Sequence, residues 1–368
     1  MAVTILKCPN CGGELVFDPG QQKQKCEYCG SQFGQQELEK LLASQENSGE
    51  DGGDEQDGRD ACKAKKASGR TDSKTEAMFY TCPNCGAQIV TEETTAATFC
   101  YYCHSPVVLQ GRLSGEFSPD LVIPFAFDKK EAVKQFLNYV GRKKFVPKDF
   151  FDESQIEKLC GVYYPYWSCD CELTGKITGE AAKVRVWQNG ETEFTETSMY
   201  RVKRSGAVSL EYITRNALTK GNRALVEGVL PYRLREAKKF HLGYLSGFLA
   251  EKRDMEREQM EEEVHQEARK QAERSLRNSI QGYSTVTVGS AHTVLEQEHW
   301  RYLLLPVWVL TYRGKEGDTY FYAMNGQTGT VWGELPVDYK KLGIFSGIVM
   351  AVVFLLALLL FLAGGYGL

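Results

Sequence analysis

The sequence carries one four-cysteine pattern twice. Each copy has two Cys-x-x-Cys motifs separated by 14 residues, and the second copy lies 74 residues after the first without insertion or deletion. The eight cysteines are Cys8, Cys11, Cys26, Cys29, Cys82, Cys85, Cys100 and Cys103. A Cys-x-x-Cys turn directs two thiolates toward one point, and two such turns complete a tetrahedron of sulfur around zinc. The duplication therefore predicts two zinc ribbons, over residues 1–43 and 78–112.

Both predicted sites fill every ligand position with sulfur. Such a site has no place for an activated water, so we expect two structural zinc ions and no chemistry at either. A ribbon of about 30 residues has a small core, and metal binding on the order of 10 kcal/mol would supply most of its stability. A rubredoxin-like iron centre is the chemical alternative.

Three further cysteines, Cys160, Cys169 and Cys171, lie in the later part of the sequence. Cys169 and Cys171 are two residues apart in a predicted strand, so both side chains are expected on one face. A third metal site that includes Cys160 is one interpretation, and small buried apolar side chains are the other. We find no phosphate loop, no nucleophile elbow and no paired carboxylates in an apolar setting, so we predict no catalytic residues and no enzyme.

The rest of the chain divides by composition. Residues 44–77 are rich in Gly, Asp and Glu and then in Lys, with few apolar residues, which predicts a flexible charged tether between the ribbons. From residue 113 the pattern predicts an α+β body of mixed strands and helices. An aromatic strand followed by an Asn-Gly turn occurs in 113–228 and again in 229–338, and we interpret the two segments as modules related by a weaker duplication.

The second module contains one extra helix, predicted over about residues 242–280. This segment has no Pro, and its apolar residues recur every four positions from Met260 to Ile280. We expect a half-solvated helix that lies on the sheet. A coiled coil is the alternative.

A single transmembrane helix is predicted at residues 342–363. Fifteen of these 22 residues are Leu, Ile, Val or Phe, none is charged, and as a helix they would rise about 33 Å, the thickness of a bilayer core. Lys340 and Lys341 precede the span, and the sequence does not open with a signal peptide. We therefore expect a single-pass protein of the cell membrane, with the N-terminal bulk in the cytosol and the C-terminus outside.

Small residues in the span suggest a second role for it. Gly343, Gly347 and Ala351 are spaced by four, a pattern that lets transmembrane helices approach closely. Homo-oligomerisation through this helix is one expectation.

Charge argues against nucleic acid as the partner. The whole chain has a formal charge of −4, residues 1–34 are neutral, and residues 78–112 have a net charge of −1. Phosphate contacts require clusters of Lys and Arg, which neither ribbon has.

Several motifs together resemble a known family. They are the two Cys-Pro-Asn-Cys turns, the segments 162–167 (VYYPYW), 304–308 (LLPVW) and 323–329 (AMNGQTG), and the terminal span. The sequence resembles bacterial membrane proteins with a TFIIB-type zinc ribbon, found mostly in Gram-positive bacteria. The resemblance implies a membrane-anchored adaptor, in some members associated with SPFH-type or phage-shock-type membrane-stress proteins.

These observations give two functional hypotheses. The first is a zinc-ribbon adaptor or scaffold that recruits protein partners to the cytoplasmic side of the cell membrane. The alternative is a membrane-tethered protein of the transcription or replication type that binds nucleic acid, because ribbon folds often do so.

Overall fold

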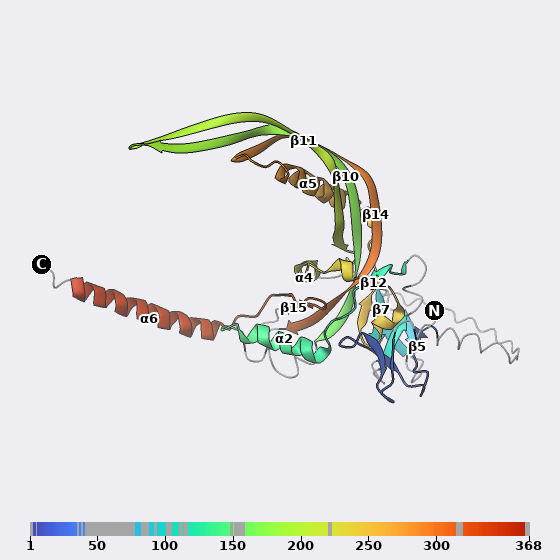
Figure 1. The fold of residues 1–368 in the computed structure, drawn as a ribbon. Coiled ribbons are helices and arrows are strands. Elements are labelled where there is room, and N and C mark those ends of the chain that lie inside the picture. The colour runs from blue at the N-terminus through green and yellow to red at the C-terminus, as the bar shows by residue number, and fades with distance from the viewer. Residues whose placement is uncertain are drawn as a thin grey trace, which may run out of the picture.

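The computed structural model (Figure 1) describes residues 3–4, 6–34, 37, 40, 78–81, 88–91, 94–100, 105–109, 113, 117–147, 150, 159–219, 223–313 and 319–364. The predicted tether, residues 44–77, lies outside them. Across the described ranges the chain forms four α-helices and sixteen strands, a strand-dominated α+β fold.

The helices are α2 (Lys129–Gly141), α4 (Arg223–Gly228), α5 (Glu261–Asn278) and α6 (Tyr339–Gly364), with short 3-10 helices η4 (Leu234–Glu236), η5 (Leu242–Leu245) and η6 (Arg257–Gln259). The strands are β1 (Val3–Thr4), β2 (Leu15–Asp18), β3 (Lys23–Cys26), β4 (Gln32–Phe33), β5 (Met78–Thr81), β6 (Gln88–Thr91), β7 (Thr95–Phe99), β8 (Pro106–Leu109), β9 (Leu121–Val122), β10 (Cys160–Asn189), β11 (Thr192–Asn216), β12 (Lys238–Lys239), β13 (Leu249–Glu251), β14 (Thr285–Arg313), β15 (Thr319–Asn325) and β16 (Val331–Gly333).

One sheet of eleven strands organises the body. Its main path is β1-β8-β7-β13-β10-β14-β15-β16, and β11 lies beside β10. The two aromatic segments of the sequence lie on the neighbouring strands β10 and β14, which pair antiparallel with Gly161 opposite Trp308 and Pro165 opposite Leu304. Both segments thus form the centre of a single sheet. The division of the body into two repeated modules stays a prediction.

Aromatic side chains fill the core on one side of these central strands. The Phe125 ring lies 4.1 Å from Phe248, 5.0 Å from Tyr163 and 5.0 Å from Trp308, measured between ring centroids. Gly161 is required here, because a Cβ at that position would come within 2.6 Å of the Phe248 ring. The absence of a side chain at one strand position lets two aromatic rings stack against the sheet.

Strands β10, β11 and β14 continue far beyond the body as a curved arm. They contain 30, 25 and 29 residues, and Figure 1 shows them arching over α4 toward the side from which α6 projects. Register shifts interrupt the pairing of β10 at Cys169/Cys171, Glu172/Leu173 and Thr178/Gly179. Such bulges bend and twist a strand, which accounts for the curvature of the arm.

Helix α5 packs on the concave side of the arm. Its predicted apolar stripe is confirmed, because Val264, Ala268, Ala272 and Leu276 are all buried against the sheet. The predicted extent, 242–280, is wrong for the first half of the segment. There Gly247 has a φ of +90°, and the chain forms η5, β13 and η6 before the helix begins. Strand β13 in this segment pairs with β10 and β7. This tertiary pairing overrides the helical tendency that a sequence without Pro suggests.

The two Asn-Gly turns differ from each other. At Asn189 the turn to β11 has two residues, with a positive φ at Gly190, so the hairpin is confirmed. The second is a longer loop: the Asn325 amide donates to the Thr330 carbonyl (2.8 Å), and the Asn325 side chain accepts from the Gln327 amide (2.8 Å). An Asx turn organises this loop in place of a two-residue hairpin.

Helix α6 is the predicted apolar span, and residues 339–359 are long and apolar enough to cross a membrane, with none of that stretch buried in the fold. Its first turn is fixed to the body. The Asp338 amide donates to the Phe145 carbonyl (2.6 Å), Lys341 Nζ donates to the Val146 carbonyl (2.7 Å), and the Phe145 and Phe345 rings lie 5.3 Å apart. The helix therefore leaves the body in a defined direction, away from the N-terminal strands (Figure 1).

The aromatic core gives a stability prediction. Phe125→Ala should lower the free energy of unfolding by about 3–5 kcal/mol, because it removes a buried ring and leaves a cavity among three others. Urea unfolding of the detergent-purified chain measures it. Leu137→Ala on the exposed side of α2 is the control, with an expected loss below about 1 kcal/mol. Equal losses in the two variants would contradict this description of the core.

Candidate metal centre

The first four-cysteine set comes together at one end of a small three-stranded sheet, β2-β3-β4. The turn before β2 supplies Cys8 and Cys11, and the end of β3 with the turn after it supplies Cys26 and Cys29. Cys8 Sγ lies 3.6 Å from Cys29 Sγ, and Cys11 Sγ lies 3.5 Å from Cys26 Sγ. All four sulfurs lie within 4.8 Å of one another, so the sequence prediction of a shared site is confirmed for this set.

These distances fit a tetrahedral metal ion. Four sulfurs at about 2.3 Å from a central zinc would be about 3.8 Å apart, close to the separations found here. Cys8 and Cys26 are buried while Cys11 and Cys29 reach the surface, so an ion would lie between the ribbon core and solvent. Four thiol ligands leave no open position, and the set is suited to a structural ion.

Two glycines let the cysteine turns close. Gly12 and Gly30 have φ values of +72° and +74°, a conformation that costs an L-residue energy, and their amides donate to the carbonyls of Cys8 and Cys26.

Ser31 affects the protonation of one of the four sulfur ligands, Cys29. The pKa of the Cys29 thiol is lowered to about 6 because the side chain and backbone of Ser31 hydrogen-bond with its sulfur. A lowered pKa favours the thiolate, the form of cysteine that binds metal.

The first ribbon is docked on the body. The Phe17 amide donates to the Ser246 carbonyl (3.1 Å), and the Ser246 hydroxyl donates to the Leu15 carbonyl. Gln24, fully buried, donates to the Gly243 carbonyl (2.8 Å). The docking segment is η5 and the loop that follows it, the part of the chain expected from sequence to be helical. These contacts give the ribbon a fixed position that its composition did not predict.

The second four-cysteine set is described only at Cys100, which is fully buried. Cys82, Cys85 and Cys103 lie outside the described residues, so the second zinc site stays a prediction. Strands β7 and β8 from this unit join the main sheet, where β7 pairs with β13 and β8 pairs with β1. The second unit is therefore continuous with the body.

The later cysteines form two separate places. Cys169 Sγ and Cys171 Sγ lie 3.4 Å apart under α5, and both are fully buried among apolar side chains. Cys160 lies nine residues back along β10, about 30 Å away for an extended strand, and its sulfur contacts the Val309 carbonyl. A single metal site made of all three is excluded by this distance.

One cluster was not foreseen from the sequence. His265 Nε2 lies 2.6 Å from Glu298 Oε2, and Glu261 completes a group within 4.8 Å. Glu261 and His265 are four residues apart and share one face of α5, a signal present in the sequence. Glu298 comes from β14, and only the folded arm brings this strand beside His265. The contact ties the first turns of α5 to the arm.

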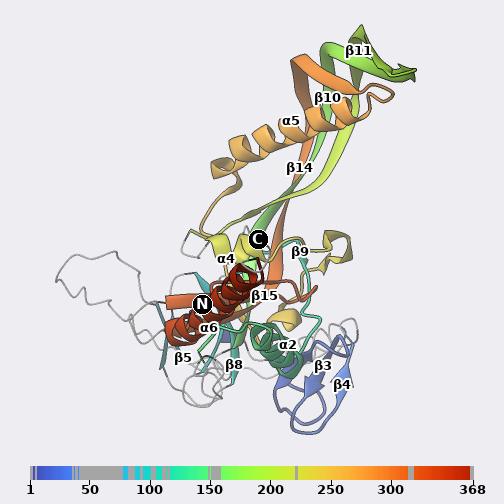
Figure 2. The same cartoon turned by 90° about the vertical axis from the view of Figure 1, so that its left-hand side faces the viewer.

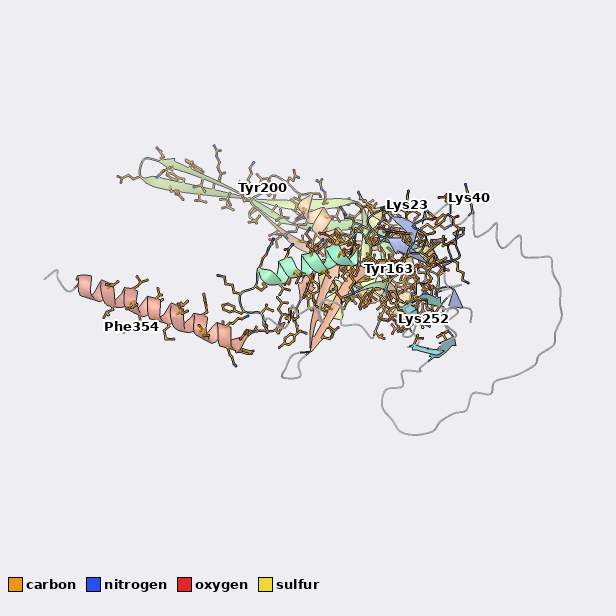
Figure 3. The ribbon with its side chains drawn as sticks, turned by 90° about the horizontal axis from the view of Figure 1, so that it is seen from below. Lys23, Lys40, Tyr163, Tyr200, Lys252 and Phe354 are labelled. Carbon is orange, nitrogen blue, oxygen red and sulfur yellow. The ribbon has the colours of Figure 1, made fainter. Side chains whose placement is uncertain are left out.

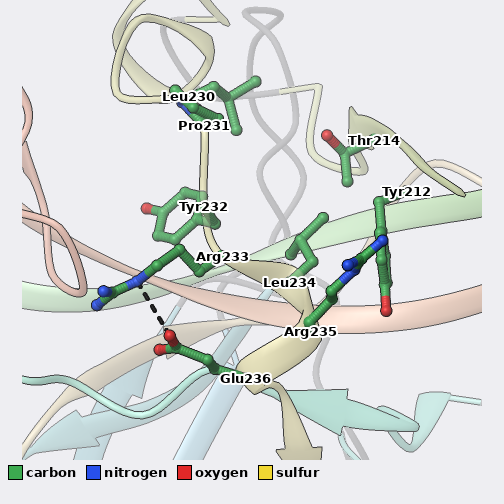
Figure 4. Close-up of a pocket in the computed structure, with 9 residues that line it drawn as sticks. All are labelled: Tyr212, Thr214, Leu230, Pro231, Tyr232, Arg233, Leu234, Arg235 and Glu236. Carbon is green, nitrogen blue, oxygen red and sulfur yellow. Dashed lines mark ion pairs between the residues drawn. The ribbon is translucent and has the colours of Figure 1, made fainter.

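A surface cavity of about 530 Å³ lies beside β11 and η4 (Figure 4). Arg233 pairs with Glu236 at 3.2 Å, and Leu230 and Leu234 contribute apolar wall. The Tyr232 hydroxyl donates to the Pro306 carbonyl (2.8 Å), and burial raises the pKa of Tyr232 well above its usual value, so it stays protonated. The residues that line this cavity include no activated nucleophile.

The chain has a full-length relative. A protein of Bacillus subtilis (strain 168) named "Uncharacterized protein YdjG" is 30% identical over 362 residues, and the alignment covers 98% of each chain. No family model matches the chain, and no solved structure matches it. The resemblance to TFIIB-type ribbon proteins therefore stays a prediction.

The sulfur cluster gives a direct prediction about metal content. Cys26→Ser should lower the zinc content of the purified chain by one ion per molecule, because one buried ligand of four is lost. Elemental analysis after extensive dialysis measures it. Cys160→Ser is the matched control and should leave the zinc content unchanged. Full zinc in Cys26→Ser, or an equal loss in Cys160→Ser, would contradict the assignment.

Proposed function

This chain belongs to the family that includes YdjG of Bacillus subtilis, and from that premise we propose that it is a membrane-anchored zinc-ribbon adaptor. It would hold a metal-stabilised docking surface at a fixed place on the cytoplasmic side of the cell membrane. Partner proteins recruited there would be brought to the membrane.

The observation that carries the proposal is the combination of a closed sulfur site, a docked ribbon and a terminal apolar helix. A four-thiol site supports structure, and the ribbon strands are already held by Leu15, Phe17 and Gln24. The face left open is the pair of cysteine turns. Tyr28 at the tip of the second turn is 87% exposed, an unusual position for an aromatic side chain and one suited to anchoring a protein contact.

The membrane anchor in the proposal is α6. Lys340 and Lys341 at its start favour the cytosol, so the ribbons and the body would lie inside the cell and the C-terminus outside. The ribbon strands and α6 lie on opposite sides of the body in Figure 1. In this orientation the ribbon would face the cytosol, where soluble partners are available.

The resemblance noted above suggests the class of partner. SPFH-type and phage-shock-type membrane-stress proteins would fit a scaffold with one anchor and one docking surface. Self-association through Gly343, Gly347 and Ala351 would multiply that surface. These residues lie on the described part of α6, and a Cβ added at Gly343 or Gly347 would meet no other atom within 4 Å, so that face is open to a second helix.

Nucleic acid is the alternative partner, and the ribbon charge opposes it. Three lysines are balanced by three carboxylates, so the ribbon offers no excess positive charge to phosphates. The residues are Lys7, Lys23 and Lys25 against Glu14, Asp18 and Glu27.

Partner recruitment should depend on the exposed turn. Tyr28→Ala should abolish co-purification of protein partners with the detergent-extracted full chain, because it removes the aromatic anchor without touching a sulfur ligand. Quantitative mass spectrometry of the purified complexes measures it. Tyr28→Phe is the matched control and should retain the partners. Unchanged partners in Tyr28→Ala would reject the ribbon as the docking surface, and steeply salt-dependent DNA or RNA binding would favour the alternative.

The orientation can be tested with cysteine chemistry. All twelve natural cysteines precede α6, so an impermeant maleimide applied to intact cells should not label the natural protein. Leu368→Cys places a thiol after the span and should become labelled. Labelling of the natural protein, with no increase in Leu368→Cys, would reverse the proposed orientation.

A further inference from the structure

Two of the described strands form the end of the arm. Strand β14 begins at Thr285, opposite Ala182, so the hairpin end, residues 183–198, has no third strand beside it within the described part of the chain. A two-stranded hairpin is marginal in water unless other material covers it. Some additional contact is therefore expected at this end of the protein.

Both faces of the hairpin end carry exposed apolar side chains. On one face the Trp187 and Phe194 rings stack 5.7 Å apart, and both are more than 40% exposed. The opposite face presents Val184 and Val186, which are 41% and 55% exposed. In the three-stranded part of the arm, α5 covers one face, and the other face is mainly polar with Met199 and Val294 exposed on it. The hairpin end thus differs from the rest of the arm, because it carries exposed apolar side chains on both faces.

The charges of the hairpin end limit how deep a contact can be. Arg185 lies opposite Glu196 in the strand pairing and 5.8 Å from the Trp187 ring centroid. Glu191 lies in the turn and Glu193 near the start of β11, and the segment has a net charge of −1. Carboxylates do not enter a hydrocarbon core cheaply, whereas aromatic rings with polar neighbours are enriched at the membrane interface. The composition matches the headgroup region of a bilayer.

The hairpin end and α6 project from the same side of the molecule. Figures 1 and 3 show this from perpendicular directions, and Figure 2 shows the two elements separated across the body. The contacts of Asp338 and Lys341 with residues 145 and 146 fix the direction of α6. A bilayer crossed by α6 in that direction therefore lies where the hairpin end points.

We propose that the hairpin end, residues 183–198, contacts the interfacial region of the bilayer that α6 crosses. The inference rests on α6 as the membrane anchor of the proposed function. A protein groove that accepted one face would leave the other apolar face in water, whereas headgroups and upper acyl chains surround both faces. Two separated contacts would hold the body at a fixed orientation to the membrane, which a single helix cannot do.

The test uses the full chain reconstituted in phosphatidylcholine and phosphatidylglycerol vesicles, with and without bromine on the upper part of the acyl chains. Bromine quenches tryptophan emission at short range. The protein has five tryptophans, so each variant is compared with the natural chain. Trp187→Phe keeps the apolar ring and removes the reporter. Trp300→Phe is the matched control, because Trp300 lies on the covered part of the arm, 6.4 Å from Trp167.

We expect brominated lipid to reduce the emission of the natural chain, and Trp187→Phe to lose most of this quenching. Trp300→Phe should show the same quenching as the natural chain. If the protein floats with the vesicles but Trp187→Phe and the natural chain are quenched equally, the hairpin contact is rejected while the α6 anchor stands. If the protein does not float with the vesicles, the anchor and the hairpin contact are both rejected.

Discussion

Strand β10 is the constraint on which the rest of the structure depends. Its first third pairs with β13 and β14 in the aromatic core, and its remainder pairs with β11 and β14 along the arm. Because side chains alternate across a strand, its register sets both faces at once. Cys169 and Cys171 face α5, whereas Asp170 between them forms an ion pair with Arg301 on the opposite face. A slip of one residue would bury the charge and expose both thiols.

The same sheet links the metal site to the terminal helix. The first ribbon docks through Ser246 and Gly243, and the next strand, β13, pairs directly with β10. On the other side, β14 pairs with β15, and the segment that follows β16 leads to Asp338 and the start of α6. The ribbon, the core and the proposed anchor are therefore parts of one connected body. The proposed adaptor would thus present its docking surface at a defined place instead of on a loose linker.

Sequence predicted the features that depend on local spacing. The sulfur ligands of the first ribbon follow from two Cys-x-x-Cys turns, α6 from an uninterrupted apolar run, and the buried stripe of α5 from a four-residue period. The arm could not be predicted at its full length, because residues 183–189 of β10 are all exposed and the strands depend on one another for pairing. Helical composition between 242 and 260 was misleading, since Tyr244, Leu245 and Phe248 are drawn into the core and into the ribbon interface. The His265–Glu298 contact required knowledge of which strand lies under α5.

The central claim is that metal in the sulfur site keeps the first ribbon folded as part of a membrane-anchored body. Hydrogen exchange of the full chain in lipid nanodiscs, measured before and after chelation, tests it most directly. With metal bound, the amides of Leu15 and Phe17 should be protected about as well as those of the central strands, because they donate to the carbonyls of Leu6 and Ser246. Chelation should remove this protection and leave that of β10 and β14 intact. Rapid exchange at these ribbon amides while zinc is bound would contradict the account.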